Sequence, residues 1–417
     1  MIQIDLPPLY NYCAIRYHTK HRSKKFLGVV NIVEQQFYLD ELFRLKNNFS
    51  VKVITGIRDT GKSTLLKNFA NELKARGVSE KEIIFIECAT IDTLNNFQQL
   101  YNLVEEQTVG LEKFFLLVDD IDCVSDSEKA INAFFVGAPA EIYVTSSGET
   151  IADKISALLP ENCDVLKLYP ISFADYKKNF PTENADELLQ KYLHFGSLPD
   201  TLNIDEKILP IILRGLVYEI LFDIAAKNSL QKANIFHLMI KLLSKNIGKT
   251  IKPNRLVDEI VNRGFGVHRN SVRAYLNFVD EIFVKVPRLD IKSGNFLKSG
   301  ERFYCVDNGL LSALRNFDGV TETALLENTV CLELLRRGFK VSCGLLGAMN
   351  INFVATRGDR KIFIQVLPTD GTVTIRKITR PLRALPDDCE KLLITLKPVK
   401  TFGDIPTVTL KDFLLND

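Results

Sequence analysis

Residues 51–64 read VKVITGIRDTGKST, and Gly56 to Ser63 match the pattern G-x-x-x-x-G-K-[ST] in full. A short apolar segment precedes the motif, and residues 62–76, which have helical spacing, follow it. A glycine-rich turn between a strand and a helix can wrap its backbone N–H groups around phosphate oxygens, and the helix N-terminus favours negative charge. The stretch therefore predicts a phosphate-binding loop in an α/β domain. The alternative is a glycine-rich turn that arose by chance, but the strand and helix on either side argue against it.

The residue types of the loop suggest a role for each position. We expect Lys62 to contact the β- and γ-phosphates, the Ser63 hydroxyl to bind Mg²⁺, and Thr64 to lie near the α-phosphate. The expected cofactors are therefore ATP or ADP together with Mg²⁺. The predicted nucleotide-binding residues are Gly56, Ile57, Arg58, Asp59, Thr60, Gly61, Lys62, Ser63 and Thr64.

The sequence around the loop alternates apolar runs with helical segments. Helical spacing is seen at 62–76 and again at 92–107. Continuous apolar strands separated by helices are typical of a parallel sheet covered on both faces. The predicted strands are VKVITG (51–56), EIIFIEC (82–88), KFFLLVDDID (113–122), EIYVTSS (141–147) and VLKLYPISF (165–173).

Polar residues at the ends of two of these strands complete the predicted catalytic site. Asp119 and Asp120 follow five apolar residues, at the strand end where doubly wound sheets bind ligands. We expect Asp119 to hold Mg²⁺ and Asp120 to polarise the attacking water. Thr145 or Ser146 is a candidate sensor of the γ-phosphate, and with Lys62 these residues form the predicted catalytic set. A capped turn after each strand is the alternative interpretation.

At these residues the chain resembles the AAA-superfamily ATPases, in the prokaryotic branch known as "ATP-binding protein", which carries a C-terminal domain of unknown function. The resemblance covers roughly residues 30 to 400. It implies an α/β fold with a P-loop parallel-sheet ATPase core, followed by a helical region, a winged helix and a small α/β nuclease-like domain. The segments that carry it are VKVITGIRDTGKSTLL, LLVDDID, IYVTSSG, LYPISFADY, YLHFGSLPD (192–200), RLDIKSGNFLKSGERFYCVDNGL (288–310) and LLENTVCLELLRRGFKV (325–341).

Two departures from the family pattern concern catalysis. Such ATPases usually have Glu after the Mg²⁺-binding Asp, and the shorter Asp120 places its carboxylate about 1.5 Å from the usual position, a displacement that can cost ~100-fold in rate. The segment ENCDV (161–165) lacks the arginine that often precedes the fifth strand. The resemblance therefore implies an ATPase with slow turnover, or a protein that mainly senses nucleotide.

Residues 231–305 are predicted to form a winged helix. Its third helix is expected to begin near His268, with Val272, Leu276 and Val279 facing the core. Residues 241–302 contain thirteen Lys/Arg and six Asp/Glu, a local net charge of +7 that leaves −5 for the rest of the chain. A basic face attracts DNA phosphates, although a winged helix can also serve only for packing between domains. The candidate DNA-binding residues are Arg269, Asn270 and Arg273 on the helix and Lys292 and Lys298 on the wing.

Residues 306–417 resemble a PD-(D/E)XK nuclease-like fold whose catalytic acids are mostly replaced. Glu327 is retained, but Asn352 stands where related proteins often have Asp, and Gln365-Val-Leu367 replaces E-x-K. One carboxylate cannot build a two-metal site, so we expect a catalytically inactive binding or docking domain.

The whole chain has 417 residues, a length that predicts two to four domains. Its net charge is +2, and its 46% hydrophobic residues are ordinary for a folded protein. The eight cysteines lie far apart and no apolar run is long enough to span a bilayer, so we expect a cytoplasmic protein with reduced thiols and no membrane contact.

The expected divisions are a basic segment (1–30), an ATPase core (31–175) that begins with a helix at 31–48, a lid-like helical region (176–230), the winged helix and the nuclease-like domain. The predicted partners are ATP and double-stranded DNA, with a homo-oligomer or a protein partner as further possibilities. The alternatives to an ATPase are a nucleotide-dependent DNA-binding regulator and a protein scaffold.

Overall fold

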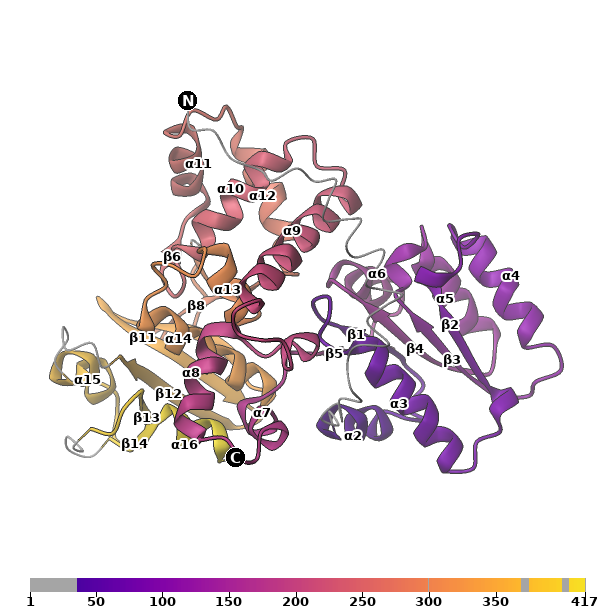
Figure 1. Ribbon diagram of the computed structural model, residues 1–417, viewed down its shortest axis with the longest axis horizontal. Helices are drawn as coiled ribbons and strands as arrows, with labels where there is room; N and C mark the ends of the chain where they lie inside the picture. Colours follow the sequence, from indigo (N-terminus) through magenta and orange to yellow (C-terminus); the bar gives the residue numbers. More distant parts are fainter. Residues whose placement is uncertain (1–35, 299, 369–374, 400–404, 417) are drawn as a thin grey trace.

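The computed structural model describes residues 36–298, 300–368, 375–399 and 405–416 (Figure 1). The predicted basic segment at 1–30 lies outside the described residues. Of the helix predicted at 31–48, the described part forms α2 (Gln36–Arg44).

A five-stranded parallel sheet forms the first part of the chain, with strand order β2-β3-β4-β1-β5. The five predicted strands are therefore confirmed, with bounds that differ by a few residues, and so is the α/β class. In this order β1, which leads into the glycine-rich loop, lies between β4 and β5. The strands are β1 (Val51–Thr55), β2 (Ile83–Glu87), β3 (Phe114–Asp119), β4 (Ala140–Ser146) and β5 (Cys163–Lys167).

Helices cover both faces of this sheet, which explains why its strands are apolar without interruption. Along β3, Phe114, Leu116 and Val118 pack into a core with α4 (Phe97–Gln107), α5 (Ser127–Gly137) and α6 (Thr150–Leu158). The intervening Phe115 and Leu117 pack on the opposite face with α2 and α3 (Lys62–Ala75). Because successive strand residues point to opposite faces, a strand buried on both sides needs an apolar residue at every position.

The helices that follow β5 pack mainly against the C-terminal half of the chain. α7 (Phe173–Asn179) and α8 (Ala185–Phe195) contact α16 (Leu410–Leu415), and α8 and α9 (Leu209–Lys227) contact α13 (Asn308–Leu314). One continuous hydrophobic core joins Phe173 near the start of this region to Leu414 near the end of the chain. The boundary predicted between a lid-like region and the later domains thus falls within a shared core, and the predicted division stays a prediction.

Two of the segments that resemble the ATPase family meet in this core. Asp307 caps α13 by accepting the Leu310 N–H, 3.0 Å from donor to acceptor, and it also accepts the Ser197 N–H at 2.8 Å. Gly309 lies so close to the end of α8 that a Cβ atom there would stand 2.0 Å from the Phe195 carbonyl oxygen. YLHFGSLPD and CVDNGL therefore form one contact, which neither segment reveals alone.

Residues 233–305 form three helices and a small antiparallel sheet with strand order β6-β9-β7. The third helix is α12, which is shorter than the sequence predicts because it continues as a 3₁₀ turn at Leu276–Phe278. Val272 and Val279 are fully buried, as expected. The elements are α10 (Ala233–Ser244), β6 (Thr250–Ile251), α11 (Pro253–Val261), α12 (Arg269–Tyr275), β7 (Phe283–Val286) and β9 (Glu301–Cys305).

Between β7 and β9 the chain contributes a strand to a different sheet. β8 (Arg288–Asp290) pairs in parallel with β10 (Lys340–Leu346), at the edge of a six-stranded mixed sheet. The segment predicted as a wing therefore bridges two sheets.

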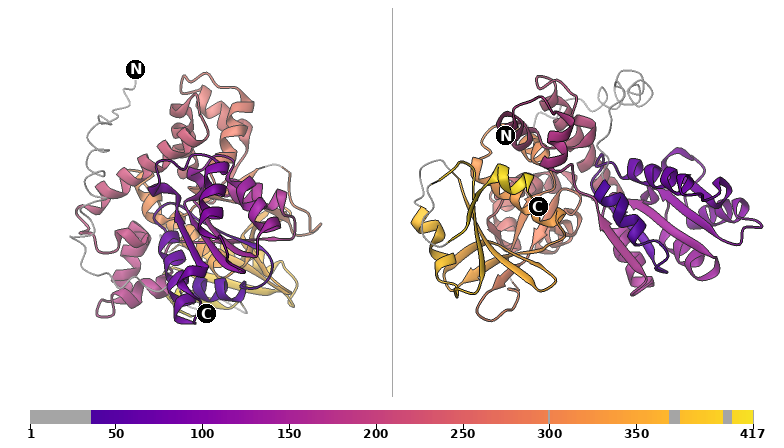
Figure 2. Two further views of the ribbon diagram at one scale, coloured as in Figure 1. Left: turned by 90° about the vertical axis from the view of Figure 1, so that its right-hand side faces the viewer. Right: turned by 90° about the horizontal axis from the view of Figure 1, so that it is seen from below.

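The six-stranded sheet has the order β14-β13-β12-β11-β10-β8 and lies at the opposite end of the molecule from the parallel sheet (Figure 2). α14 (Glu322–Arg336) packs with one face of it, whereas Leu382 and Leu385, in and just after α15 (Ile375–Arg383), pack on the other. For this part of the chain the sequence pattern predicts a helix at 324–337 and the strands KVSCGLL, INFVAT, KIFIQVL and KLLITL, and these are confirmed by α14, β10, β11, β12 and β13. The remaining strands are β11 (Met349–Arg357), β12 (Arg360–Leu367), β13 (Glu390–Thr395) and β14 (Thr407–Thr409).

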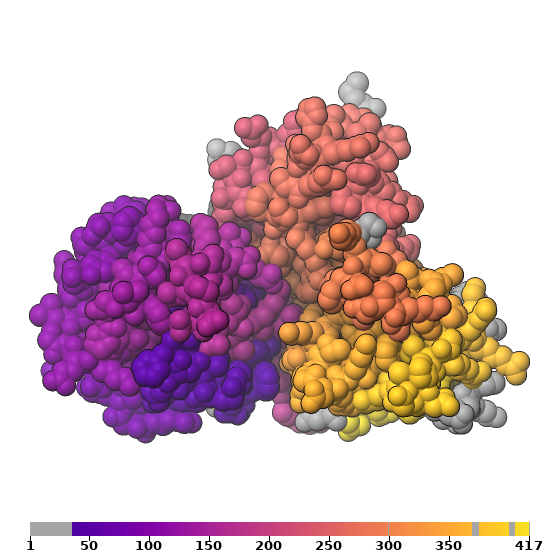
Figure 3. Space-filling view, turned by 180° about the vertical axis from the view of Figure 1, so that it is seen from behind, coloured from indigo at the N-terminus to yellow at the C-terminus, as the bar shows by residue number. Residues whose placement is uncertain are grey.

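The space-filling view shows the parallel-sheet part and the C-terminal part as two lobes in contact (Figure 3). Within the residues that the structure describes, no helix is both long enough and apolar enough to cross a membrane. Seven cysteines lie in the described ranges, and each is a free thiol.

Candidate functional site

The glycine-rich loop joins β1 to α3 and holds Lys62 in a buried position. The Lys62 ammonium donates to the carbonyl oxygens of Gly56 at 2.8 Å and Ile57 at 3.1 Å. Thr60 closes the loop from within, because its hydroxyl donates to the Ile57 carbonyl at 2.7 Å. The loop is therefore folded around the lysine side chain. Ser63 and Thr64 lie in the first turn of α3, where backbone N–H groups have no partners within the helix.

Gly56 is required by a close approach to the end of β5. A Cβ atom at this position would lie 2.5 Å from the Leu168 carbonyl oxygen, and the backbone has a φ of 153°. The Leu168 N–H also donates to the Thr55 carbonyl at 2.7 Å, which ties β5 to the start of the loop. A side chain at residue 56 would push these strands apart at the point where the loop begins.

The predicted acids and hydroxyls at the ends of β3 and β4 come together beside the loop. The Thr145 hydroxyl donates to Asp119 Oδ1 at 2.6 Å and accepts the Asp120 N–H at 2.8 Å. Asp119 and Thr145 are buried, whereas Asp120 is half-buried and has a left-handed backbone conformation, with a φ of 53°. Thr145 thus holds the Asp119 carboxylate and the Asp120 backbone, and its role in sensing the γ-phosphate stays a prediction.

Asp122 is a further member of the site that the sequence analysis did not assign. Its carboxylate accepts the Ser147 N–H at 2.6 Å, and its Oδ1 atom lies 2.9 Å from the Ser146 hydroxyl oxygen. Asp122 therefore fixes the chain just after β4. Its spacing in LLVDDID was the available signal, but the partners of an acid in a turn cannot be read from spacing alone.

The electrostatic environment of Lys62 is dominated by acids. Burial lowers the pKa of Lys62, and the carboxylates of Asp120, Asp122, Asp59 and Glu281 oppose this effect. Burial together with the neighbouring Asp119 raises the pKa of Asp120. A cation surrounded by carboxylates beside a phosphate-binding loop is an arrangement suited to a ligand that brings both phosphate and a divalent metal.

The oxygen atoms of Ser63 and Asp119 fit the chemistry of Mg²⁺. Magnesium prefers hard oxygen ligands and usually keeps several waters, using one or two protein carboxylates together with substrate phosphates. No group of three or more His, Cys, Asp or Glu side chains that could hold a metal occurs among the described residues. Ser63 and Asp119 thus supply the kind of oxygen atoms that a metal shared with a nucleotide uses.

Helix α9 reaches this site from outside the parallel-sheet part. Arg58 of the loop forms an ion pair with Asp223 at 2.5 Å, and Lys227 donates to the Ser147 hydroxyl at 2.5 Å. In Figure 1, α9 is drawn between α10 and the parallel-sheet part. Asp223 and Lys227 were not identified from the sequence, because neither belongs to a motif.

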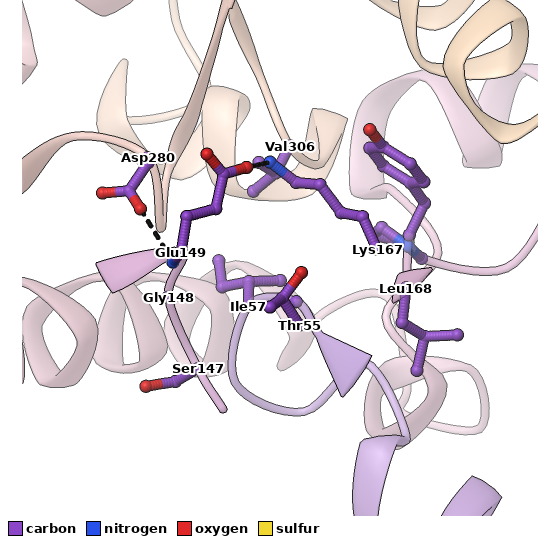
Figure 4. Close-up of a pocket in the computed structure, with 12 residues that line it drawn as sticks. Thr55, Ile57, Ser147, Gly148, Glu149, Lys167, Leu168, Asp280 and Val306 are labelled. Carbon is purple, nitrogen blue, oxygen red and sulfur yellow. Dashed lines mark hydrogen bonds and ion pairs between the residues drawn. The ribbon is translucent and has the colours of Figure 1, made fainter. Parts of the chain in front are cut away.

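A pocket next to the loop is lined by both halves of the molecule (Figure 4). Thr55, Ile57 and Lys167 come from the parallel-sheet part, whereas Asp280 and Val306 come from the segments around β7 and β9. The Glu149 N–H donates to Asp280 Oδ2 at 3.0 Å, and the Glu149 carboxylate pairs with Lys167. The nucleotide site is thus in direct contact with residues more than 100 positions later in the chain.

The candidate DNA-binding residues all lie on the surface. They lie outside the nucleotide site, on α12 and in the loop after β8. The exposed residues are Arg269, Asn270, Arg273, Lys292 and Lys298.

The residues of the nuclease-like pattern are brought together between α14, β11 and β12. Asn352 accepts the Val366 N–H at 3.1 Å, and its own N–H donates to Gln365 Oε1 at 3.0 Å. Glu327 is half-buried nearby and interacts with Asn352, Tyr304 and the cationic Arg302. The amides of Asn352 and Gln365 are thus used in hydrogen bonds to the sheet, and a guanidinium lies near the one retained carboxylate.

The parallel-sheet part of the chain matches a known protein family. Residues 48–177 match a family model described as an AAA domain. The chain therefore contains an AAA-type P-loop domain, as the resemblance implied, and domains of this class bind nucleotide.

Individual proteins similar to this chain are known from sequence and from structure. A protein of Haemophilus influenzae described as uncharacterized is 28% identical over 382 residues, which cover 88% of this chain and 94% of the relative. The Aeropyrum pernix ORC1 protein, solved in complex with DNA, matches 67% of this chain and 92% of its own at 10% identity and a TM-score of 0.35. A chain from a structure of katanin self-assembly matches 45% of this chain and 66% of its own, at 13% identity and a TM-score of 0.28.

Proposed function

We propose that this protein binds ATP with Mg²⁺ and hydrolyses it slowly, and that its nucleotide state controls a C-terminal half that binds double-stranded DNA. The observation that carries the nucleotide part is the folded loop, in which Lys62 is held by the Gly56 and Ile57 carbonyls beside the acids at the end of β3. In this site Lys62 would bind the β- and γ-phosphates, and Ser63 and Asp119 would hold Mg²⁺.

Chemically, Mg²⁺ would neutralise charge on the phosphates when it is bound. The loop N–H groups would bind the phosphate oxygens, and Asp120 would orient a water molecule for attack on the γ-phosphate. Thr145 supports this geometry because it fixes both Asp119 and the Asp120 backbone. No arginine stands in the segment 161–165, so charge at the γ-phosphate would be stabilised mainly by Lys62 and the loop.

The direct test of nucleotide binding is Lys62→Ala, which removes the cation from the centre of the loop. We expect this variant to lose measurable affinity for a fluorescent ATP analogue. Lys74→Ala is the matched control, since Lys74 lies on the same helix, is exposed and pairs with Glu80. Equal binding by the Lys62→Ala variant and the wild-type protein would contradict the proposal.

The second candidate function is a nucleotide-dependent DNA-binding regulator that hydrolyses little or no ATP. The short side chain of Asp120 favours it, as do the exposed basic residues on α12. We infer that residues 233–305 form a winged helix, because three helices and a sheet of order β6-β9-β7 are the elements such a domain requires. We also infer that the nuclease-like domain is inactive and serves for binding or docking.

Steady-state phosphate release with Mg²⁺ and ATP separates the two functions. Duplex DNA should be titrated at two salt concentrations, because phosphate contacts weaken steeply as salt rises. Turnover that DNA stimulates favours an ATPase switch, and nucleotide and DNA binding without turnover favours the regulator. Nucleotide binding without salt-sensitive DNA binding would instead favour a protein scaffold.

Our proposed location for the protein is the cytoplasm.

A further inference from the structure

The turn between α12 and β7 contributes two neighbouring acids, Asp280 and Glu281, to the rim of the nucleotide site. We call residues 280–282 the acidic turn. Asp280 accepts the Glu149 N–H at 3.0 Å, so the acidic turn is attached to the chain just after β4. The Glu281 side chain is only 12% exposed and packs against the Gly148 backbone, where an added Cβ atom would lie 3.3 Å from its Cγ. Asp280 and Glu281 of the C-terminal half therefore both contact the parallel-sheet part.

Glu281 is connected to the catalytic acids through a short series of contacts. Its Oε1 atom lies 3.8 Å from the Lys227 ammonium, which in turn donates to the Ser147 hydroxyl. The Ser147 N–H donates to Asp122 at 2.6 Å, and Asp122 is three residues from Asp119. These contacts join the acidic turn to α9, to the segment after β4 and to the turn after β3.

The same carboxylate acts on the phosphate-binding lysine. Glu281 and Lys62 influence each other electrostatically, and Asp122 and Asp280 add negative charge around Glu281. Burial raises the pKa of Glu281 to about 7, which shows that the ionised form is already held at a cost. A triphosphate at Lys62 would bring several more negative charges into this partly buried environment.

We propose that the acidic turn is a nucleotide-sensitive contact: ATP bound at Lys62 repels Glu281, competes with it for Lys227, and releases the turn from residues 147–149. This inference rests on the proposed function, because it requires the loop to bind nucleotide. It names the structural element through which the nucleotide state reaches the C-terminal half. Glu281 acts here through charge and position and is not a catalytic residue.

The physical basis is repulsion between like charges at low effective dielectric. Two unit charges a few ångströms apart at a partly buried site interact several times more strongly than in bulk water. Lys227 is partly exposed, donates a hydrogen bond to Ser147 and forms an ion pair with Glu281, so a phosphate oxygen can attract its ammonium away from either partner. Because β7 follows the acidic turn directly and the 3₁₀ turn at the end of α12 precedes it, release of the acidic turn frees α12 and β7 from the nucleotide site.

The first experiment measures nucleotide affinity in Glu281→Gln, with Glu301→Gln as the matched control. Glutamine keeps the shape of the side chain and removes its charge, so the fold is retained. Glu301 is an exposed acid on β9 of the same half. We expect Glu281→Gln to bind a fluorescent ATP analogue about tenfold more tightly than wild type, and Glu301→Gln to match wild type.

The second experiment follows amide hydrogen exchange of residues 279–283 in the unmodified protein, with and without Mg²⁺ and a non-hydrolysable ATP analogue. Nucleotide should accelerate exchange of this segment. In Glu281→Gln the acceleration should be smaller, because the neutral side chain is not repelled.

The outcomes distinguish the two levels of the proposal. If neither the wild type nor the variants bind nucleotide, the proposed function is wrong and this inference is wrong with it. If all three proteins bind with equal affinity and exchange at 279–283 does not change, nucleotide binding stands and the inference alone is overturned.

Discussion

Asp120 illustrates how one methylene group can set the speed of a reaction. Its carboxyl lies beside Asp119 and within the field of Lys62, and its pKa is raised by burial. We expect Asp120→Glu to raise the steady-state rate of phosphate release at saturating ATP, by up to ~100-fold, because the longer side chain restores the usual carboxylate position. Asp120→Asn should remove turnover.

Asp126→Glu is the control for this experiment. Asp126 is exposed, pairs with Lys129 and has nearly the same left-handed backbone as Asp120, with a φ of 54°. The control therefore contains the same chemical change in the same conformation, away from the site, and should leave turnover unchanged. A slower Asp120→Glu enzyme would show that the short side chain is not what limits the rate.

Glu327 predicts a dependence of stability on pH. Burial raises the pKa of Glu327 to about 7, against the opposing effects of Arg302, Tyr304 and Asn352. The folded state therefore binds this proton more tightly than the unfolded state, so the free energy of unfolding falls as pH rises from about 4.5 to about 7, by roughly 3 kcal/mol for this group.

Glu327→Gln should reduce that fall, because the amide does not titrate. The measurement is the urea midpoint at pH 5.5 and at pH 8, compared between wild type and the variant. Asp307 and Glu281, whose pKa values are also raised by burial, leave a residual slope in the same direction. Glu106→Gln, an exposed position on α4, should retain the full slope. Identical pH dependence in Glu327→Gln and wild type would refute the assignment to Glu327.

The sequence predicted the site residues that stand in the loop motif or at the ends of apolar strands, and it missed Asp122 and the residues that reach the site from distant elements. Lys62, Ser63 and Asp119 stand in motifs whose spacing reflects local backbone geometry. Lys227 and Glu281 reach the same site from distant elements, and their neighbours in the chain carry no motif. Their position depends on how the two halves pack, which is a tertiary effect that no local pattern encodes.

At the scale of elements, α8 and α13 can approach each other closely because residue 309 is a glycine and has no side chain. Gly309→Ala would place a Cβ atom 2.0 Å from the Phe195 carbonyl oxygen, so the helices must move apart. We expect a loss of about 1–3 kcal/mol or more in the free energy of unfolding, measured by chemical denaturation.

Gly215→Ala is the matched control, because Gly215 also lies within a helix, α9, but has open space around its Cα. Alanine there should stabilise the protein by up to ~1 kcal/mol, since it restricts the unfolded chain and favours the helix. The crossing would not depend on the close approach of Gly309 if both variants had the same stability.

Most helices and strands could be predicted from the sequence, but the sheet that a strand joins could not. The apolar runs of the parallel sheet appear where the pattern placed them, because burial on both faces leaves a continuous apolar signature. The third helix of residues 233–305 ends earlier than expected, at Tyr275, since Leu276 to Phe278 tighten into a 3₁₀ turn before the acidic turn. Strand β8 has only three residues, too few for a pattern to show which sheet it joins.

At the scale of the whole molecule, the net charge of +2 is the sum of a basic middle segment and an acidic remainder. If α12 contacts DNA phosphates, replacing Arg269 and Arg273 with alanine should weaken binding to all duplex sequences. The slope of log affinity against log salt should fall by about 2, because two phosphate contacts are lost. Fluorescence anisotropy of a labelled duplex across a salt series measures both quantities.

Arg255→Ala provides the control, since Arg255 is an exposed arginine on α11 that forms an ion pair with the neighbouring Glu259. Its removal should change the affinity and the slope less than the double variant does. A double variant with an unchanged salt slope would assign the basic face of α12 to another role.

The path of the chain through β8 limits the order in which the strands can pair while the protein is being synthesised. β7 and β9 belong to one sheet, and the strand between them completes the edge of another through β10, about fifty residues later. During synthesis the small sheet can form once β9 has emerged, but β8 has no partner until β10 follows. A product that stops near residue 306 would therefore expose both an unpaired strand and the apolar surface that the last helices cover. Residues 233–305 cannot be inherited or exchanged as a free-standing module, so natural rearrangements of this protein should retain them together with the C-terminal sheet.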